Sequence, residues 1–189
     1  MAKVYEFLAN GFEEIEALAP LDILRRGGVD VKTVSITGSE FVESAHGVTV
    51  KADLIFENTT GFGDADMLMI PGGMPGAANL NAHEGLRNLF LTHNEQHKLI
   101  GAICAAPMVL GSLGIVKGRK ATCYPGFEKF LDGASYTAEL VTVDDNITTG
   151  KGPAASFMYG FCILEQLTSK AVAEDVKAGM LINELIALR

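Results

Sequence analysis

Cys104 is the residue of this chain whose position best suits a nucleophile. It ends the apolar run Leu99–Ile103, and alanines stand two residues before and two residues after it (Ala102, Ala106). Small residues around a reactive side chain are typical of a sharp strand-to-helix turn, where bulky neighbours would collide. Amide groups and the dipole at a helix N-terminus would lower the pKa of the thiol and make it nucleophilic or easily oxidised. The alternative is a buried cysteine that packs as a small hydrophobic side chain.

A glycine-rich loop follows the apolar segment Met67–Ile70 and begins with Pro71, Gly72 and Gly73. Glycines permit backbone conformations in which successive amide groups point into one concavity. Beside a thiolate, the amides of Gly72 and Gly73, together with that of Ala105, would bind a developing oxyanion. The alternative is an ordinary tight turn. The loop lacks the six-position phosphate fingerprint of dinucleotide-binding folds, so no nucleotide cofactor is predicted.

The first predicted helix, Glu13–Arg26, begins with three acidic residues. Glu13 and Glu14 suit a first helical turn, where the helix dipole favours negative charge. Glu16 lies one turn beyond Glu13 among apolar residues, so we expect its carboxyl group to be partly buried, with a raised pKa. Protonated, Glu16 could donate a hydrogen bond to a sulfur anion, and ionised it could act as a base.

Several further residues could contribute to a site, and each has a structural alternative. Tyr124 could supply a hydroxyl group or cover the core with its ring. Lys151 and Gly152 could bind an anion through amide groups and the ammonium group, or only begin the next helix. Cys123 ends a strand and is expected to be a packed core thiol, with a resolving partner for Cys104 as the alternative. Cys162 lies in an apolar helix and is expected to be structural.

The histidines give no catalytic or metal site. His83, His93 and His97 accompany a polar helix and are expected at the surface, whereas His46 lies in a hairpin turn. None follows Cys104 directly, the position at which a cysteine–histidine catalytic pair would place one. Metal-ligand spacing is also absent, so the sequence predicts neither a metal nor another cofactor.

Composition favours one soluble globular domain spanning residues 1–189. The chain is 48% hydrophobic and 20% charged, as is typical of folded proteins. Its formal net charge of −8 disfavours nucleic acid or an anionic membrane as the main partner. Three cysteines without Cys-x-x-Cys spacing favour a reducing compartment over a disulfide scaffold. With no leader-like segment and no apolar run that could span a bilayer, we expect a cytoplasmic protein.

Short apolar runs alternate with helical periodicity, which predicts a mostly parallel sheet with helices on both faces. The predicted strands are Val4–Leu8, Val31–Ile36, Met67–Ile70, Leu99–Ile103, Lys120–Cys123 and Leu140–Val143, with a hairpin within 40–56. The predicted helices are Glu13–Arg26, Ala77–Asn94, Ala105–Leu113, Pro153–Leu167 and Ala171–Leu188. The buried side of the first helix is assigned to Ile15, Leu18, Leu21, Ile23 and Leu24. Sites in such folds lie beyond the carboxyl ends of the strands, so the loops at 9–14 and 71–76 should converge with Cys104.

These features occur in the order found in a known family. The segments 102–107, 71–73 and 13–16, with Pro20, Arg25-Arg26 and Gly152-Pro153, resemble the ThiJ/PfpI superfamily and, within it, the parkinsonism-associated deglycase and YajL-like branch. The resemblance covers nearly the whole chain, and the motifs are specific together rather than singly. It implies a flavodoxin-like (class I glutamine amidotransferase-like) three-layer sandwich and a homodimer.

The resemblance also implies roles for individual residues. Cys104 would be the oxidation-prone nucleophile, Glu16 its protonated hydrogen-bond partner, and the amides of Gly72 and Gly73 the oxyanion donors. Tyr124 stands where human-type members carry a histidine, so a histidine base is not expected.

Two positions bear on the surroundings of the site. His46 replaces an arginine that is common near the site in relatives, which removes one expected anion-binding group. Arg26 is retained and is expected near the subunit contact.

Three hypotheses about function follow. In the first, Cys104 attacks methylglyoxal, glyoxal or their protein or nucleotide adducts while Glu16 moves the proton, as in a deglycase or a glutathione-independent glyoxalase. In the second, oxidation of Cys104 makes the protein a sensor of oxidative stress or a chaperone. The third is a thiazole-pathway or amidotransferase-like role, because the fold permits many chemistries. Proteolysis fits poorly, because the protease branch carries a histidine directly after the cysteine.

Overall fold

The centre of the molecule is a seven-stranded sheet, seen in a computed structural model that describes residues 1–187. The strand order is β10-β11-β7-β6-β1-β2-β5, and every neighbouring pair is parallel except the antiparallel pair β10–β11. The strands are β1 (Lys3–Leu8), β2 (Asp30–Ser35), β5 (Leu54–Ile55), β6 (Met67–Ile70), β7 (Leu99–Ile103), β10 (Val141–Asp144) and β11 (Ile147–Gly150).

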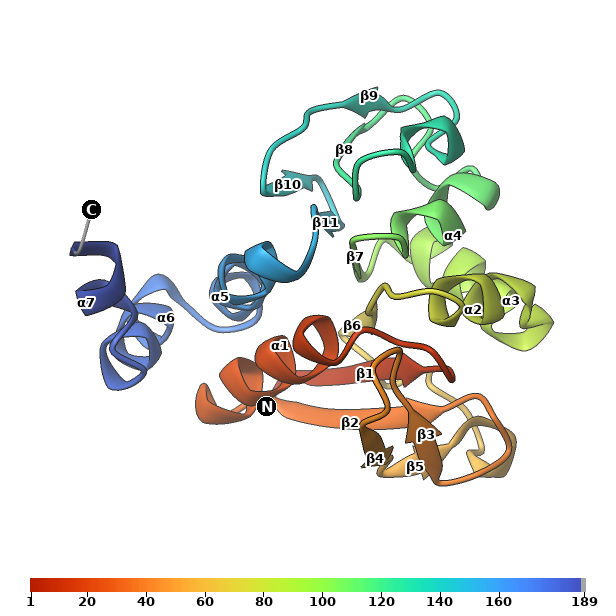
Figure 1. Cartoon of the computed structure of the whole chain (residues 1–189), viewed down its shortest axis with the longest axis horizontal. Coiled ribbons are helices and arrows are strands. Elements are labelled where there is room, and N and C mark those ends of the chain that lie inside the picture. Colours follow the sequence, from red (N-terminus) through yellow and green to blue (C-terminus); the bar gives the residue numbers. More distant parts are fainter. Residues whose placement is uncertain (188–189) are drawn as a thin grey trace.

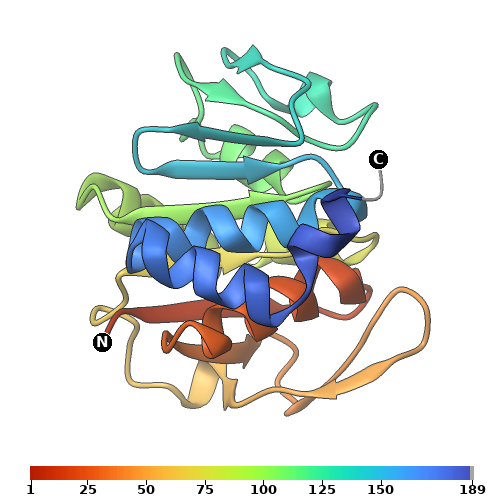
Figure 2. The same ribbon diagram turned by 90° about the vertical axis from the view of Figure 1, so that its left-hand side faces the viewer.

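Helices cover both faces of this sheet (Figure 1). One face carries α1 (Glu14–Arg26), α5 (Ser156–Leu167), α6 (Lys170–Gly179) and α7 (Ile182–Ala187), which lie in front of the strands in Figure 2. The other face carries α2 (Gly76–Ala82), α3 (Glu84–Glu95) and α4 (Pro107–Ser112). The arrangement confirms the flavodoxin-like sandwich predicted from the alternation of strands and helices.

Smaller elements extend the edges. A hairpin of β3 (Phe41–Glu43) and β4 (Thr49–Lys51) occupies the predicted excursion within 40–56. A second small sheet pairs β8 (Lys120–Ala121) with β9 (Ser135–Tyr136), so the strand predicted at Lys120–Cys123 is shorter and lies outside the main sheet. Single turns of 3-10 helix lie at Phe56–Asn58, Glu128–Phe130 and Pro153–Ala155.

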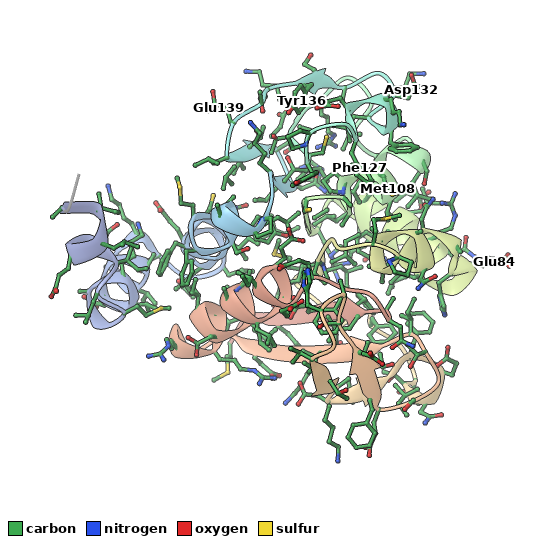
Figure 3. All side chains as sticks on the ribbon, viewed as in Figure 1. Glu84, Met108, Phe127, Asp132, Tyr136 and Glu139 are labelled. Carbon is green, nitrogen blue, oxygen red and sulfur yellow. The ribbon has the colours of Figure 1, made fainter. Side chains whose placement is uncertain are left out.

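Side chains alternate between two apolar layers, as the period of a strand requires. Phe7 and Leu68 pack under α2–α4, whereas Val4 and Met69 pack under α1 and α5. Half-buried Met108 and Phe127 contact both layers, and Figure 3 shows them where α4 meets the segment after β8. Among the described helices, none combines the length and apolar character that crossing a bilayer requires.

Two predicted helices are each broken into two. His83 is extended (φ −80°, ψ 103°) and separates α2 from α3, because its ring accepts a hydrogen bond from the Leu86 amide and caps α3. Leu181, with φ 60°, separates α6 from α7 within the predicted helix Ala171–Leu188, whose last residue lies outside the described part.

The sequence missed strand β11 at Ile147–Gly150, because two of its residues are threonines. Both Thr148 and Thr149 are buried, and the Thr149 hydroxyl accepts a hydrogen bond from the Thr122 amide. A buried strand that satisfies its polar side chains internally has no apolar run to reveal it.

Three predictions of burial were wrong. Ile15 and Leu18 of α1 are 49% and 36% exposed instead of buried. His93 was expected at the surface but is buried, with Nε2 3.0 Å from the carbonyl oxygen of Leu99. Burial lowers the pKa of His93 to about 4, so its ring is neutral and structural.

Candidate active site

Cys104 occupies a turn that its neighbours hold in an unfavourable backbone conformation. Its φ is 65°, a region that residues other than glycine seldom adopt. Its amide donates to the carbonyl oxygen of Gly150 at 2.8 Å, and its own carbonyl accepts from the amide of Tyr124 at 2.8 Å. These two bonds from β11 and the segment after β8 stabilise the turn, and they leave the sulfur-bearing side chain 8% exposed at the carboxyl edge of the sheet. Strain maintained in this way is a feature of functional sites.

Gly72 joins Glu16 of α1 to the cysteine turn. Its amide donates to Oε2 of Glu16 at 2.9 Å. A Cβ atom at Gly72 would lie 2.6 Å from that oxygen, 2.7 Å from Cβ of Cys104 and 2.9 Å from the amide nitrogen of Ala105. Only glycine therefore fits between the carboxylate and the thiol, and the loops at 9–14 and 71–76 converge with Cys104.

Glu16 is fully buried, and burial raises its pKa to about 7. Hydrogen bonds with the Cys104 thiol and the Gly72 amide oppose this rise, whereas the neighbouring Glu13 charge adds to it. Oε1 of Glu16 has no other partner in the described protein. The carboxyl group is therefore suited to hold a proton beside the sulfur, as the sequence predicts.

The thiol of Cys104 differs from the expectation of an ionised sulfur. Burial and the negative charge of Glu16 raise its pKa, whereas hydrogen bonds from the amides of Gly73 and Ala105 lower it. Glu16 stops opposing the thiolate when it is protonated, because its charge is then lost. Two negative charges on Glu16 and Cys104 together are therefore unfavourable. Around neutral pH the two groups share one proton, which either the carboxyl group or the sulfur holds.

The amides that point at the sulfur are those of Gly73 and Ala105, and the Gly72 amide is engaged by Glu16. Gly72 is therefore a support for the carboxyl group and not a free oxyanion donor. Gly73 has φ 86°, and a Cβ atom there would collide with the amide nitrogen of Glu13 and lie 2.6 Å from the carbonyl oxygen of Gly11. Glu13 itself accepts from the Glu16 amide at 2.7 Å and caps α1.

Tyr124 lines a pocket at the surface of the protein, on the segment that follows β8. Its ring is 46% exposed and borders, with Lys151 and Gly152, a shallow and largely apolar pocket of about 180 Å³. Lys151 donates to the carbonyl oxygen of Ala138 at 2.9 Å, so its ammonium group is turned away from the anion-binding role considered for it. The structure gives Tyr124 a backbone contact with Cys104, through its amide, and no hydroxyl contact there.

His46 and Arg26 lie outside the contacts of the cysteine. His46 is exposed and its Nδ1 lies 3.0 Å from the Glu14 carboxylate, whose hydrogen bond raises the pKa of the imidazole. Oxygens of Glu13 and Glu14 and a nitrogen of His46 lie within 4.8 Å of one another, but existing hydrogen bonds account for this cluster. Arg26 pairs with Asp22 and lies ten residues along α1 from Glu16, about 15 Å away.

The other cysteines have no comparable surroundings. Cys123 is fully buried in the layer beneath α2–α4, and burial raises its pKa to about 12. Cys162 is half-buried on α5, where burial raises its pKa and a contact with Gln166 opposes the rise. Among residues 1–187, no buried carboxyl group and no pair of amides is directed at either of these thiols.

The profile of the DJ-1/PfpI family matches residues 2–166. The chain belongs to the DJ-1/PfpI family. It is 33% identical over 180 residues to the Parkinson disease protein 7 homolog of Danio rerio, covering 94% of this chain and 95% of that protein. The oxidized DJ-1 of Toxoplasma gondii superposes with a TM-score of 0.89 at 37% identity, covering 96% of this chain and 98% of that one.

A third relative is an enzyme by name. The glutathione-independent glyoxalase DJR-1.2 of Caenorhabditis elegans is 34% identical over 156 residues, covering 82% of each protein. The chain spans less than half the length of two Arabidopsis thaliana DJ-1 homologs that it also matches, 45% and 42%.

Proposed function

We propose that this DJ-1/PfpI protein is a Cys104-dependent enzyme that converts 2-oxoaldehydes such as methylglyoxal to 2-hydroxy acids without glutathione. One observation carries the proposal: the strained Cys104 turn places the sulfur between two amide donors and a buried carboxyl group that holds a proton near neutral pH. The glyoxalase described for the Caenorhabditis elegans relative supports the substrate class.

The geometry suits the following steps. The thiolate of Cys104 forms a C–S bond with the aldehyde carbon, and the carbonyl electrons move to oxygen, near the amides of Gly73 and Ala105. Glu16 gives its proton to this oxygen and becomes a carboxylate. As a carboxylate it then removes the proton from the former aldehyde carbon, and the electrons of that C–H bond form the C=C bond of an enediol. The proton on the first oxygen passes to the second oxygen, and Glu16 returns its proton to the adjacent carbon, which leaves a thioester. Water cleaves the thioester, so methylglyoxal and one water yield lactate and the free thiol.

The same thiol addition extends to the adducts that these aldehydes form with amines and thiols of proteins or nucleotides. Attack of Cys104 on the adduct carbon would release the amine or thiol, and the later steps would again give the hydroxy acid. This deglycase reaction needs the adduct to reach a sulfur that is 8% exposed, which favours small and terminal adducts over buried ones.

Lactate release from methylglyoxal tests the proposal. We expect Cys104→Ser and Glu16→Gln to lose nearly all turnover, whereas Cys162→Ser, which changes a half-buried thiol on α5, retains it. Free lactate is measured enzymatically after removal of the aldehyde. Equal rates in the wild type and in Cys104→Ser would overturn the proposal.

Redox sensing is the second candidate. A protonated Glu16 beside Cys104 would donate a hydrogen bond to a sulfinate and stabilise that oxidation state. Mass spectrometry after mild peroxide treatment should find oxidation at Cys104 before Cys123 or Cys162. Uniform oxidation of the three thiols would contradict a sensor role and leave the turnover assay unaffected.

A homodimer is proposed from the resemblance and from exposed apolar side chains of the same face. These are Ile15 and Leu18 on α1 and Phe157 and Met158 on α5, between 36% and 54% exposed. A dimer would bury them and bring a second chain close to the site. Light scattering tests this, and Met158→Glu should convert a dimer to a monomer; a monomeric wild type would contradict it.

A further inference from the structure

Five buried side-chain oxygens in the described residues have no hydrogen-bond partner, and they belong to four residues in one layer of the protein. The residues are Glu6, Glu16, Ser156 and Tyr159. All lie between the sheet and the helices α1 and α5, and all are fully buried. The burial of Glu16 is accounted for by its contact with the Cys104 thiol. Glu6, which carries two unpartnered oxygens, and Tyr159 are not used by the proposed reaction, and buried polar groups of this kind require an explanation.

Strand register places Glu6 and the Tyr159 hydroxyl on the same face of the sheet, at the same level and two strands apart. Glu6 of β1, Met69 of β6 and Gly101 of β7 are paired in register, so their side chains point to the same face of the parallel sheet. The Tyr159 hydroxyl lies over Gly101, where it would collide with a Cβ atom. The negative potential of Glu6 acts on Tyr159 and adds to the rise that burial causes in the pKa of the tyrosine. An internal water is the usual bridge between such groups.

The same layer leads to the catalytic pair. Cys104 is three residues beyond Gly101, about 10 Å along the strand direction. Ser156, one helical turn before Tyr159, lies on the side of α5 that begins next to the site. Glu16 also acts electrostatically on Tyr159. The four unpartnered residues therefore lie in the layer of the protein that also holds the Cys104 side chain.

We propose that Glu6 and Tyr159 form a buried pair joined by an internal water, and that the charge of Glu6 controls how readily Cys104 becomes a thiolate. Glu6 is then a positioning residue that acts through Glu16 and Cys104 without touching substrate. Its protonated form leaves the sulfur free to ionise at neutral pH. Its ionised form at alkaline pH opposes a second negative charge in the same layer.

The groups that face Glu6 fix the sign of the effect. Burial raises the pKa of Glu6 well above its ordinary value, and the positive charge of Arg25 on α1 opposes this. Arg25 is itself paired with Asp53, so part of its potential is already neutralised. From α5 the titratable groups are Tyr159 and Cys162, both with raised pKa. The described residues of β2, β6 and β7 in the same row carry no charge.

Two titrations of the folded protein test the proposal, and neither requires turnover. NMR of the 13C-labelled side-chain carboxyl of Glu6, assigned through bond connectivity, follows its proton. Alkylation by iodoacetamide, located by mass spectrometry, follows the Cys104 thiolate. We expect Glu6 to titrate in the alkaline range. We also expect the alkylation midpoint of Glu6→Gln to lie about one pH unit below that of the wild type. Cys104 of this variant should therefore be alkylated up to about tenfold faster at alkaline pH.

Tyr159→Phe distinguishes the pair from a lone buried acid. Loss of the hydroxyl removes one partner of the bridging water, so the Glu6 carboxylate is less well hydrogen-bonded and its NMR midpoint should rise. Tyr5→Phe is the matched control: its hydroxyl donates to Asp64 on the opposite face of β1, so neither midpoint should change. Circular dichroism at each pH confirms that every variant stays folded.

Three results would overturn the proposal: Glu6 titrating in the ordinary carboxyl range, Glu6 remaining neutral until the protein unfolds, or equal alkylation midpoints in Glu6→Gln and the wild type. If Glu6→Gln does not fold, Tyr159→Phe decides. A Glu6 midpoint unchanged by that substitution would also overturn the pair.

Discussion

Cys104 and Cys123 lie close together in the fold, because the amide of Tyr124, the residue after Cys123, donates to the carbonyl of Cys104, yet their surroundings differ. Both are buried, and burial raises the pKa of both thiols. Cys123 packs in the apolar layer beneath α2–α4, and the negative charge of Glu128 adds to the rise of its pKa. Cys104 has a strained φ, two amides and a carboxyl group that holds a proton. Burial alone therefore does not separate the two thiols, and we expect the groups buried with Cys104 to make it the more reactive one.

Replacing Glu16, the proposed proton donor, should change the chemistry of Cys104 more than any other substitution. Glu16→Gln leaves a neutral side chain, so the pKa of Cys104 should fall and its alkylation in the alkaline range should accelerate. Turnover should nevertheless fall by about 10³, because no group then moves the proton during the reaction. Lactate release and alkylation rates measure the two effects. Glu14→Gln, which changes the exposed partner of His46, is the control. Parallel loss of alkylation and turnover would show that Glu16 only supports the fold.

Filling the space at Gly72 should have the next largest effect. Gly72→Ala brings a methyl group within 2.7 Å of both the Glu16 carboxylate and Cβ of Cys104, so these groups must separate. A displacement of this kind costs about 10² in kcat/KM. Gly63→Ala is a matched control, because its added Cβ would meet nothing within 4 Å and its φ needs no glycine. Unchanged kinetics in Gly72→Ala would mean that the close approach of these groups does not matter.

The raised pKa of Glu16 also predicts how stability depends on pH. The native carboxyl binds its proton up to about pH 7, whereas in the unfolded chain it ionises at its ordinary value near 4.5. The native state therefore binds more protons between these values, and its contribution to stability is lost as pH rises through them. Urea unfolding should show about 2 kcal/mol less stability from Glu16 at pH 7.5 than at pH 5. Glu16→Gln should remove this difference, and the same slope in both proteins would contradict it.

Sequence reasoning found the contacts that depend on residue type and missed those that depend on partners in space. The alanines around Cys104 and the glycines at 72 and 73 are needed for steric reasons, so their chemistry can be read from the chain. The engagement of the Gly72 amide by Glu16 depends on how α1 packs on the loop after β6, which no local pattern contains.

Most of the wrong predictions concerned which side chains are buried, because burial also depends on partners that are distant in the sequence. His93 and Thr149 are buried because backbone groups satisfy them, and Ile15 and Leu18 are exposed although the helix period favours burial. Glu6 stands in an apolar strand, and nothing in the sequence distinguishes it from an edge residue facing water. Polar side chains buried in this way become visible only when the opposite layer is in place.

Substitution of the second thiol should have the smallest effect and completes the comparison. Cys123→Ala removes a sulfur from a packed layer, and the small cavity should cost about 1 kcal/mol of unfolding free energy. Turnover and the peroxide sensitivity of Cys104 should stay unchanged, because the sulfur of Cys123 lies beneath α2–α4 whereas that of Cys104 faces α1 and α5. Urea unfolding and the lactate assay measure both. A slower oxidation of Cys104 in this variant would show that the two thiols react with one another, and would make Cys123 a resolving partner.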